Sequence, residues 1–160
     1  MADEKATKNA QAVYAALCST LDDVEWKYDR NDDGLEVTCG AQGYDLPIPL
    51  RVSVDADKEL ISIYSVLPFK APENKRREIA VAVSAANSAI VAGSFDFNCK
   101  NGMLLFRYNS VFTDSIIGKG LFKYIIMVTC ATVDQYNDRF LEIVNKDMTF
   151  DEIVEFVERR

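Results

Sequence analysis

The side chains best placed for chemistry are the oxygen donors of one short acidic segment that begins at Asp29. Asp29, Asn31 and Asp33 stand at alternate positions and Gly34 follows them, which is the first half of a calcium-binding loop. A hard cation needs several such oxygens, and the loop needs a glycine for its sharp turn. The second half is missing, because Gly40 stands where the last glutamate of the loop would be. We therefore interpret the segment as an acidic hairpin turn and keep a weak calcium site as the alternative.

The absence of histidine limits the remaining chemistry, because none of the 160 residues is a histidine. This removes the Ser-His-Asp and Cys-His arrangements, the commonest general base and the commonest transition-metal ligand. Gly118-Lys-Gly120 could form a phosphate-binding nest, but the rest of a Walker motif is missing. We interpret these glycines as the entry to a helix. We predict no catalytic residue, no cofactor and no tightly bound metal.

The four cysteines stand far apart, so that they form no CxxC motif for zinc or redox chemistry. Cys39 and Cys99 fall in stretches that alternate as strands do, and Cys18 and Cys130 fall in helical stretches. A free cysteine usually behaves as a small buried hydrophobe. We therefore predict four reduced thiols in the core of a cytosolic protein.

Charge and hydropathy argue against two classes of partner. The net charge is −7, and an acidic chain repels the phosphate backbone of nucleic acids. The one dense basic cluster, Lys75-Arg76-Arg77, has glutamates on both sides and is interpreted as a solvated helix face. No apolar run approaches the roughly 20 residues that span a bilayer, because the longest, around Leu121 to Val133, contains Lys123. We expect neither a nucleic-acid partner nor a membrane partner.

Length and the first residues set the expected organisation. A chain of 160 residues is long enough to bury one sizeable core, so a single domain over residues 1–160 is expected. The first residues, MADEKATKNAQ, are charged and lack the apolar stretch of a secretory signal. A cytoplasmic location is the expectation.

Four segments show the 3.6-residue periodicity of helices. They are expected over Ala6–Leu21, over Pro72–Ala92, from within 114–121 to Asn145, and after a capping box at Thr149–Glu152. Gly93 is expected to end the second helix in the left-handed conformation. The long third helix is predicted to turn one stripe toward the core: Leu121, Ile125, Val128, Thr132, Tyr136, Phe140 and Ile143.

Alternation of apolar and polar residues predicts the strands. Four of them precede the second helix, over Glu25–Arg30, Leu35–Cys39, Ile48–Val54 and Glu59–Val66. Pro47 and Pro49 cannot donate ladder hydrogen bonds, which predicts that the third strand begins at a sheet edge. The expected order is α-β-β-β-β-α-β-β-α-α. This order is typical of an α+β fold, an antiparallel sheet of about six strands with helices packed on one face.

The last two strands are expected to form a hairpin about Asn101-Gly102, the strongest short-range signal in the chain. A two-residue type I′ turn would pair Phe97 with Phe106 and Asp96 with Arg107. The face predicted to pack on the helices is then Phe95, Phe97, Cys99, Leu104, Phe106 and Tyr108, with Asp96 and Arg107 as an outward ion pair. Met103 and Leu105 would point to the other face, where they form a candidate interaction surface.

The chain resembles the YbjN-like family. The residues that carry the resemblance are Leu67-Pro-Phe69, the Ala-rich helix through Asn87, Gly93-Ser-Phe-Asp-Phe97 and Gly102-Met-Leu-Leu-Phe-Arg107. The resemblance covers about residues 20–157 and is strongest over 67–145. The resemblance implies a fold similar to that of type III secretion chaperones, which are small, acidic and often dimeric. It also implies a bacterial regulator of sensory transduction, and it supplies no catalytic residues.

Three hypotheses follow for function. The first is a non-enzymatic binding module, chaperone-like or regulatory, which binds a protein through its open sheet face or an edge and forms a homodimer. The second is a carboxylate- or metal-dependent enzyme that uses the Asp29–Asp33 segment. The third is a small-molecule sensor with a pocket between helix and sheet. The alternative to the homodimer is a monomer in which the long third helix half-covers the outer face.

Overall fold

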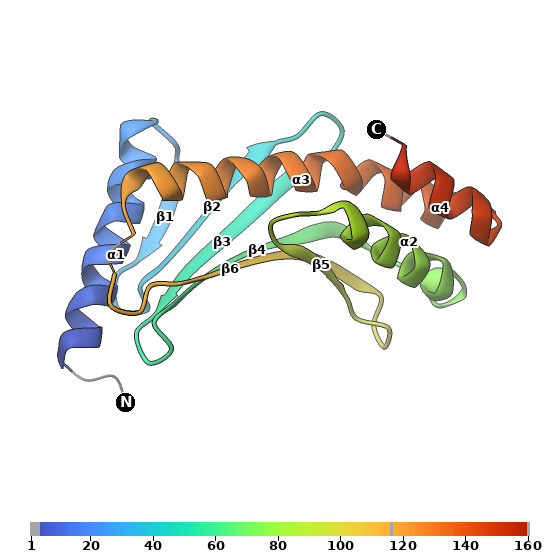
Figure 1. Ribbon diagram of the computed structural model, residues 1–160. Helices are drawn as coiled ribbons and strands as arrows, with labels where there is room; N and C mark the ends of the chain where they lie inside the picture. The colour runs from blue at the N-terminus through green and yellow to red at the C-terminus, as the bar shows by residue number, and fades with distance from the viewer. Residues whose placement is uncertain (1–3, 116, 160) are drawn as a thin grey trace.

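The computed structural model describes residues 4–115 and 117–159, so the first three residues of the N-terminal segment lie outside it. The order of helices and strands is the predicted one (Figure 1). The elements are α1 (Glu4–Asp23), β1 (Tyr28–Asn31), β2 (Glu36–Gln42), β3 (Pro47–Asp55), β4 (Leu60–Lys70), the 3₁₀ turn η1 (Glu73–Lys75), α2 (Arg76–Ala89), β5 (Ser94–Phe97), β6 (Met103–Val111), α3 (Lys119–Asn145) and α4 (Phe150–Glu158).

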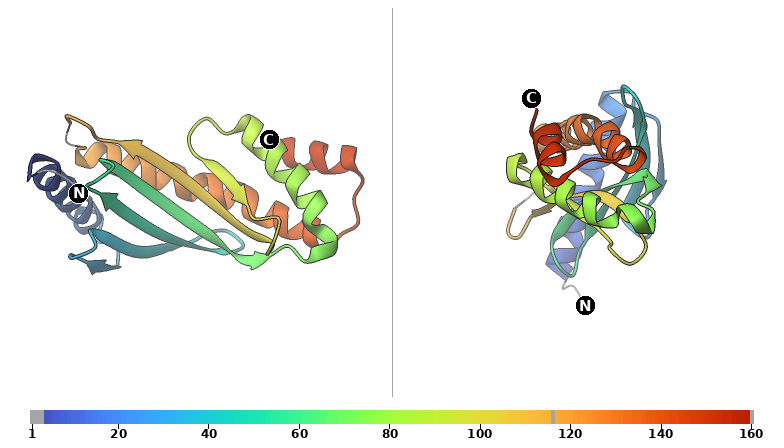
Figure 2. Two further views of the ribbon diagram at one scale, coloured as in Figure 1. Left: turned by 90° about the horizontal axis from the view of Figure 1, so that it is seen from below. Right: turned by 90° about the vertical axis from the view of Figure 1, so that its right-hand side faces the viewer.

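The six strands form one antiparallel sheet in the order β1-β2-β3-β4-β6-β5, which confirms the predicted α+β class. The helices lie on one side of the sheet, and α3 runs across it from end to end (Figure 1). In the view from below, the strands lie in front of α3 and no helix crosses before them (Figure 2, left). The sheet therefore has a covered inner face and an open outer face.

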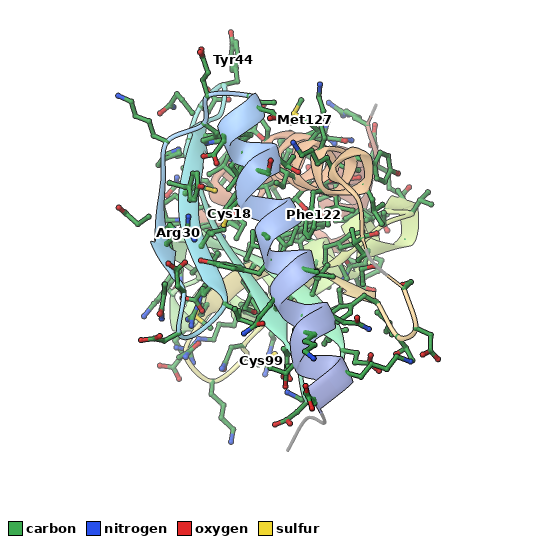
Figure 3. The ribbon with its side chains drawn as sticks, turned by 90° about the vertical axis from the view of Figure 1, so that its left-hand side faces the viewer. Cys18, Arg30, Tyr44, Cys99, Phe122 and Met127 are labelled. Atoms are coloured by element: carbon green, nitrogen blue, oxygen red, sulfur yellow. The ribbon has the colours of Figure 1, made fainter. Side chains whose placement is uncertain are left out.

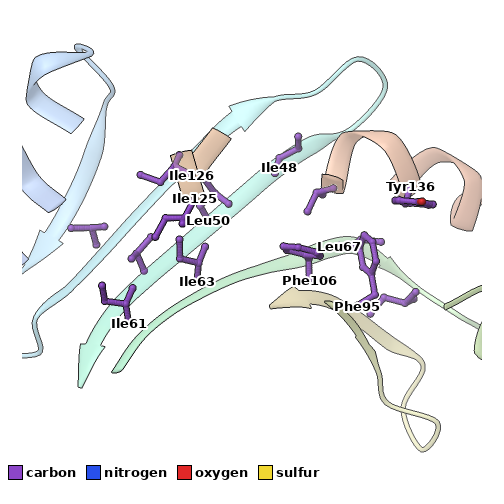
Figure 4. Close-up of a cluster of buried hydrophobic side chains, with 14 of the residues drawn as sticks. Ile48, Leu50, Ile61, Ile63, Leu67, Phe95, Phe106, Ile125, Ile126 and Tyr136 are labelled. Atoms are coloured by element: carbon purple, nitrogen blue, oxygen red, sulfur yellow. The ribbon is translucent and has the colours of Figure 1, made fainter. Parts of the chain in front are cut away.

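The core fills the space between the inner face of the sheet and α3 (Figure 4). Alternate residues of β3 and β4, such as Leu50 and Ile63, are buried there because side chains along a strand point to opposite faces in turn. Phe95 meets the rings of Phe106 and Phe140 edge-on, with ring centroids 5.1 and 5.0 Å apart. Each fully buried side chain of this size contributes roughly 1.5–3 kcal/mol to folding.

The prolines of β3 lie where the sequence predicted, although the strand itself is in the middle of the sheet. β3 is flanked by β2 and β4, but its pairing with β4 starts only at Arg51, opposite Tyr64. Pro47 and Pro49 are paired with β2 alone. The missing N–H groups therefore cost no ladder hydrogen bond on the β4 side, which is why the strand tolerates them.

Two helix predictions differ from the structure. α2 ends at Ala89 rather than Ala92, and Gly93 (φ +83°) serves the turn into β5 instead of the helix end. A Cβ at Gly93 would collide with the ring of Phe106. In the first half of α3 the predicted core stripe is only partly right: Ile125 is buried as predicted, but Leu121 is exposed, and Phe122 and Ile126 are buried outside the predicted stripe. That half is apolar all round, and periodicity alone could not choose the buried face.

Candidate interaction surfaces

The β5–β6 hairpin has a longer loop than predicted. Phe95 is opposite Phe106, a shift of two residues from the predicted register, so the two-residue type I′ turn is wrong. The carboxamide of Asn98 accepts hydrogen bonds from the backbone N–H groups of Lys100 (2.9 Å) and Asn101 (3.2 Å). An Asx turn of this kind offers the chain an alternative to a tight two-residue turn. Of the predicted turn pair, Gly102 alone has a positive φ, +74°.

A shift of two residues keeps every side chain on its predicted face. Phe95, Leu104 and Phe106 are buried as predicted, and Phe97 is half-buried against the core. Cys99 instead lies exposed in the loop, so its predicted place in a buried strand is wrong. The loop is held down, because the backbone N–H of Ala71 donates to the carbonyl of Gly102 at 2.8 Å.

Met103 and Leu105 lie on the open outer face, where the sequence placed them. Val66 is directly opposite Leu105 on the neighbouring strand β4, and Asp96 is opposite it on β5. The predicted Asp96–Arg107 ion pair is present, with 3.1 Å between Arg107 Nε and Asp96 Oδ2. Together these residues form a strip on the outer face, which we call the sheet surface: Tyr64, Val66, Asp96, Met103, Leu105 and Arg107. A shallow hollow of about 600 Å³ lies beside the sheet surface.

The edge of the sheet next to β5 is closed by one side chain. Asn87 of α2 accepts a hydrogen bond from the backbone N–H of Phe95 (2.8 Å) and donates one to its carbonyl (3.0 Å). The carboxamide thus takes the place of a neighbouring strand, which is one way to keep an edge strand from pairing with other chains. Asn87 is therefore a polar anchor bonded to nearby backbone.

The acidic turn between β1 and β2 uses a different carboxylate from the one that the calcium pattern requires. Asp32 accepts hydrogen bonds from Arg30 Nε (2.7 Å) and Tyr14 Oη (3.0 Å), and the Arg30 contact holds the pKa of Asp32 below its usual value. Asn31 Oδ1 accepts from the backbone N–H of Gly34 at 3.1 Å, which shapes the turn. Asp29, Asn31 and Asp33 are all exposed.

The other residues considered for metal, phosphate or thiol chemistry do not form a reactive site among the described residues. Within residues 4–115 and 117–159, no three His, Cys, Asp or Glu side chains are arranged to hold a metal ion. Gly118 precedes α3, and Lys119 forms an ion pair with Asp23 at 2.7 Å. Burial raises the pKa of Cys39 and Cys130 to about 11, which makes both thiols poor nucleophiles.

The first half of α3 carries a second exposed apolar region, which the sequence analysis missed. We call it the helix surface and define it as Leu121, Tyr124, Met127, Val128 and Ala131. Tyr124 and Met127 are 57 % and 56 % exposed. In Figure 3, Phe122 lies behind α1 toward the interior, whereas Met127 lies toward the outside. The signal was available in the sequence, because Lys123 is the only charged residue from Gly120 to Val133.

A hollow of about 710 Å³ borders the helix surface. Its walls come from α3, the α2–β5 connection and the end of α4; the residues include Ile90, Val91, Tyr124, Val128 and Arg159. No residue of the sheet lines it, so it is not the helix–sheet pocket that the sensor hypothesis requires. Among the described residues, no helix is long and apolar enough to cross a membrane.

The fold places the protein in a known structural class, that of small α+β proteins with an open antiparallel sheet. The structure of YbjN from E. coli, "a putative transcription regulator", is similar with a TM-score of 0.55 at 11% identity, covering 76% of this chain and 85% of that one. A chain of the HopA1-SchA chaperone-effector complex is similar with a TM-score of 0.52 at 13% identity, covering 79% and 95%. At 11% and 13% sequence identity, the similarity shows a shared fold and nothing more specific. No curated protein sequence matches the chain.

The family is established by the sequence itself. The profile of the YbjN family, described as "Putative bacterial sensory transduction regulator", matches residues 14–142. The chain belongs to the YbjN family. The predicted resemblance is confirmed, and the match covers the second half of α1, the whole sheet and most of α3.

Proposed function

We propose that the protein is a non-enzymatic, protein-binding module with a regulatory or chaperone-like role, which works in the cytoplasm as a homodimer. The observation that carries the proposal is the open outer face of the sheet, where Val66, Met103 and Leu105 form an apolar strip without a covering helix. Membership of a family described as regulators and the fold shared with a chain of a chaperone–effector complex support it.

The chemistry of the sheet surface fits a protein partner. An antiparallel sheet can keep one face in water, but that face is then usually polar. Here apolar side chains are directly opposite one another on β4 and β6, and the Asp96–Arg107 pair borders them. An apolar centre with a polar rim is the usual composition of a protein interface. The partner that fits is an extended or helical segment with a few apolar anchors.

The test is affinity capture from native cytosol, followed by mass spectrometry. Wild-type protein should retain a reproducible protein partner, and Leu105→Arg should lose it because the charge falls in the centre of the sheet surface. Val111→Arg is the matched control: Val111 lies on the same face of the same strand, 62 % exposed, at its far end. Capture that survives Leu105→Arg would contradict the proposal.

The metal-dependent alternative has its own measurement. We expect calcium titration by calorimetry to give no binding tighter than about 10⁻⁵ M, the weak end of sensor sites. Asp29, Asn31 and Asp33 are exposed, and Asn31 already accepts a backbone hydrogen bond. Tighter binding that Asp33→Asn abolishes would favour a cation site in this turn.

A further inference from the structure

The helix surface has a composition that a water-exposed helix does not need. A surface helix normally has an apolar stripe toward the core and charged residues on the opposite side. From Gly120 to Val133, α3 has apolar residues on both sides and a single charge, Lys123. A helix that is apolar all round is normally buried all round. The outer side of α3 is thus missing a covering partner.

The spacing of the exposed residues indicates what kind of element covers them. Tyr124, Met127 and Ala131 are all exposed and follow one another at intervals of three and four residues. This is the spacing of the seam between two packed helices. α3 lies along the side of the molecule away from the sheet, with no other helix beyond it (Figure 1). A helix of another chain can therefore approach the seam.

We propose that the covering element is α3 of a second copy of this chain, packed antiparallel across a two-fold axis near Met127 and Val128. The proposal rests on the homodimer in the proposed function and names its interface. Across such an axis each residue meets the one at the same distance on the other side of the centre. Tyr124 then lies opposite Ala131, so that the largest side chain of the seam meets the smallest, and Met127 lies opposite Val128.

Charge supports the antiparallel arrangement of two identical helices. The basic residue Lys123 lies four to five residues before the centre, and Asp134 lies six to seven residues after it. The two are eleven residues apart, or about three turns, so they lie on the same flank of the helix. Among the described residues Lys123 has no ion-pair partner, while Asp134 Oδ1 accepts the backbone N–H of Tyr44 at 2.7 Å. The two-fold axis would bring Lys123 of each copy near Asp134 of the other, twice per dimer.

The experiment is sedimentation equilibrium of the full chain, with folding of each variant checked by circular dichroism and melting. Wild type should have the mass of a dimer at micromolar concentration. Met127→Glu puts a charge at the centre of the seam and should raise the dimer dissociation constant at least 100-fold. The matched control is Val111→Glu, on the sheet and similarly exposed, and it should leave the mass unchanged.

A charge exchange tests the direction of packing. Lys123→Glu turns two attractions into two repulsions and should weaken the dimer about tenfold. The double variant Lys123→Glu with Asp134→Lys should restore it, because the pair is re-formed with reversed signs. A double variant as weak as the single one would overturn the antiparallel register.

The outcomes separate this inference from the proposed function. A dimer that survives Met127→Glu overturns the α3 interface and leaves the homodimer intact. A monomeric wild type overturns both the homodimer and this interface, but leaves the sheet-surface capture test standing. If the wild type is monomeric and Met127→Glu loses a captured partner, the helix surface binds a different protein. That result would overturn the proposal that a second copy of this chain covers it.

Discussion

The sheet surface and the helix surface are both apolar and exposed, but they differ in charge. The sheet surface is a narrow strip bordered by the Asp96–Arg107 ion pair, whereas the helix surface is continuous and has only Lys123 beside it. Permanent interfaces are the more apolar ones, and interfaces that exchange partners are closer in composition to ordinary surface. This difference supports the proposals of permanent self-association through α3 and of an exchangeable partner on the sheet.

Their positions allow both surfaces to work at once. The helix surface lies on α3, which covers the inner face of the sheet, and the sheet surface lies on the open outer face (Figures 1 and 2). A two-fold dimer through α3 would therefore leave two open sheets on opposite sides. Substitutions that alter one region of the molecule at a time separate the contribution of each region. They are taken from the largest expected effect to the smallest.

The largest effect is expected where the hairpin tip is docked against the chain before η1. Gly102 has a positive φ, and a Cβ there would collide with the carbonyl oxygen of Ala71. Gly102→Val should lower the free energy of unfolding by about 3 kcal/mol or more, because strain and a backbone collision add. Urea denaturation measures it. Gly120→Ala is the control, since a Cβ there meets nothing, and it should be neutral or stabilising.

The next effect concerns the closed edge. Asn87→Ala removes both hydrogen bonds to the backbone of Phe95, and each buried group left without a partner costs about 1–3 kcal/mol. The freed edge should also pair with other chains, which light scattering would detect as aggregation on mild heating. Ser88→Ala, next to it and exposed, should do neither. Unchanged scattering in Asn87→Ala would show that this side chain does not guard the edge.

A smaller, pH-dependent effect is expected where the connection between α3 and α4 is tied to η1. The ammonium of buried Lys75 donates to the carbonyl of Lys146 (2.6 Å) and to Asp147 (2.7 Å), and it holds the pKa of Asp147 below its ordinary 3.8. A lowered carboxyl pKa stabilises the fold above pH 3.8, and this stability is lost as the pH falls through the lower value.

The test is thermal melting across acidic pH. Asp147→Asn should remove this part of the acid destabilisation, so the difference in Tm between wild type and variant should shrink from about pH 6 to about pH 2.5. Lys75→Met should flatten the same part of the curve. A constant difference at all pH values would exclude the ion pair as its source.

The sequence predicted the order of elements and the faces of the strands, because both follow from local periodicity and turn residues. The hairpin register was missed because the carboxamide of Asn98 competes with the Asn101-Gly102 turn, and propensity does not rank the two. The rotation of α3 was missed because its first half is apolar on both sides. Apolar residues on both sides of this half of α3 prevented the prediction of its buried face. The exposed ones among them form the helix surface.

The smallest effect belongs to the border of the sheet surface. Asp96 and Arg107 are both about 40 % exposed, at 3.1 Å, so water screens their attraction. A double-mutant cycle with Asp96→Ala and Arg107→Ala should give a coupling of only about 0.2–1 kcal/mol in urea denaturation. Partner capture should respond more strongly than stability, because the pair sets the polar border of the strip that Leu105 occupies. If capture is as insensitive to these changes as folding, the border plays no part in recognition and the apolar strip acts alone.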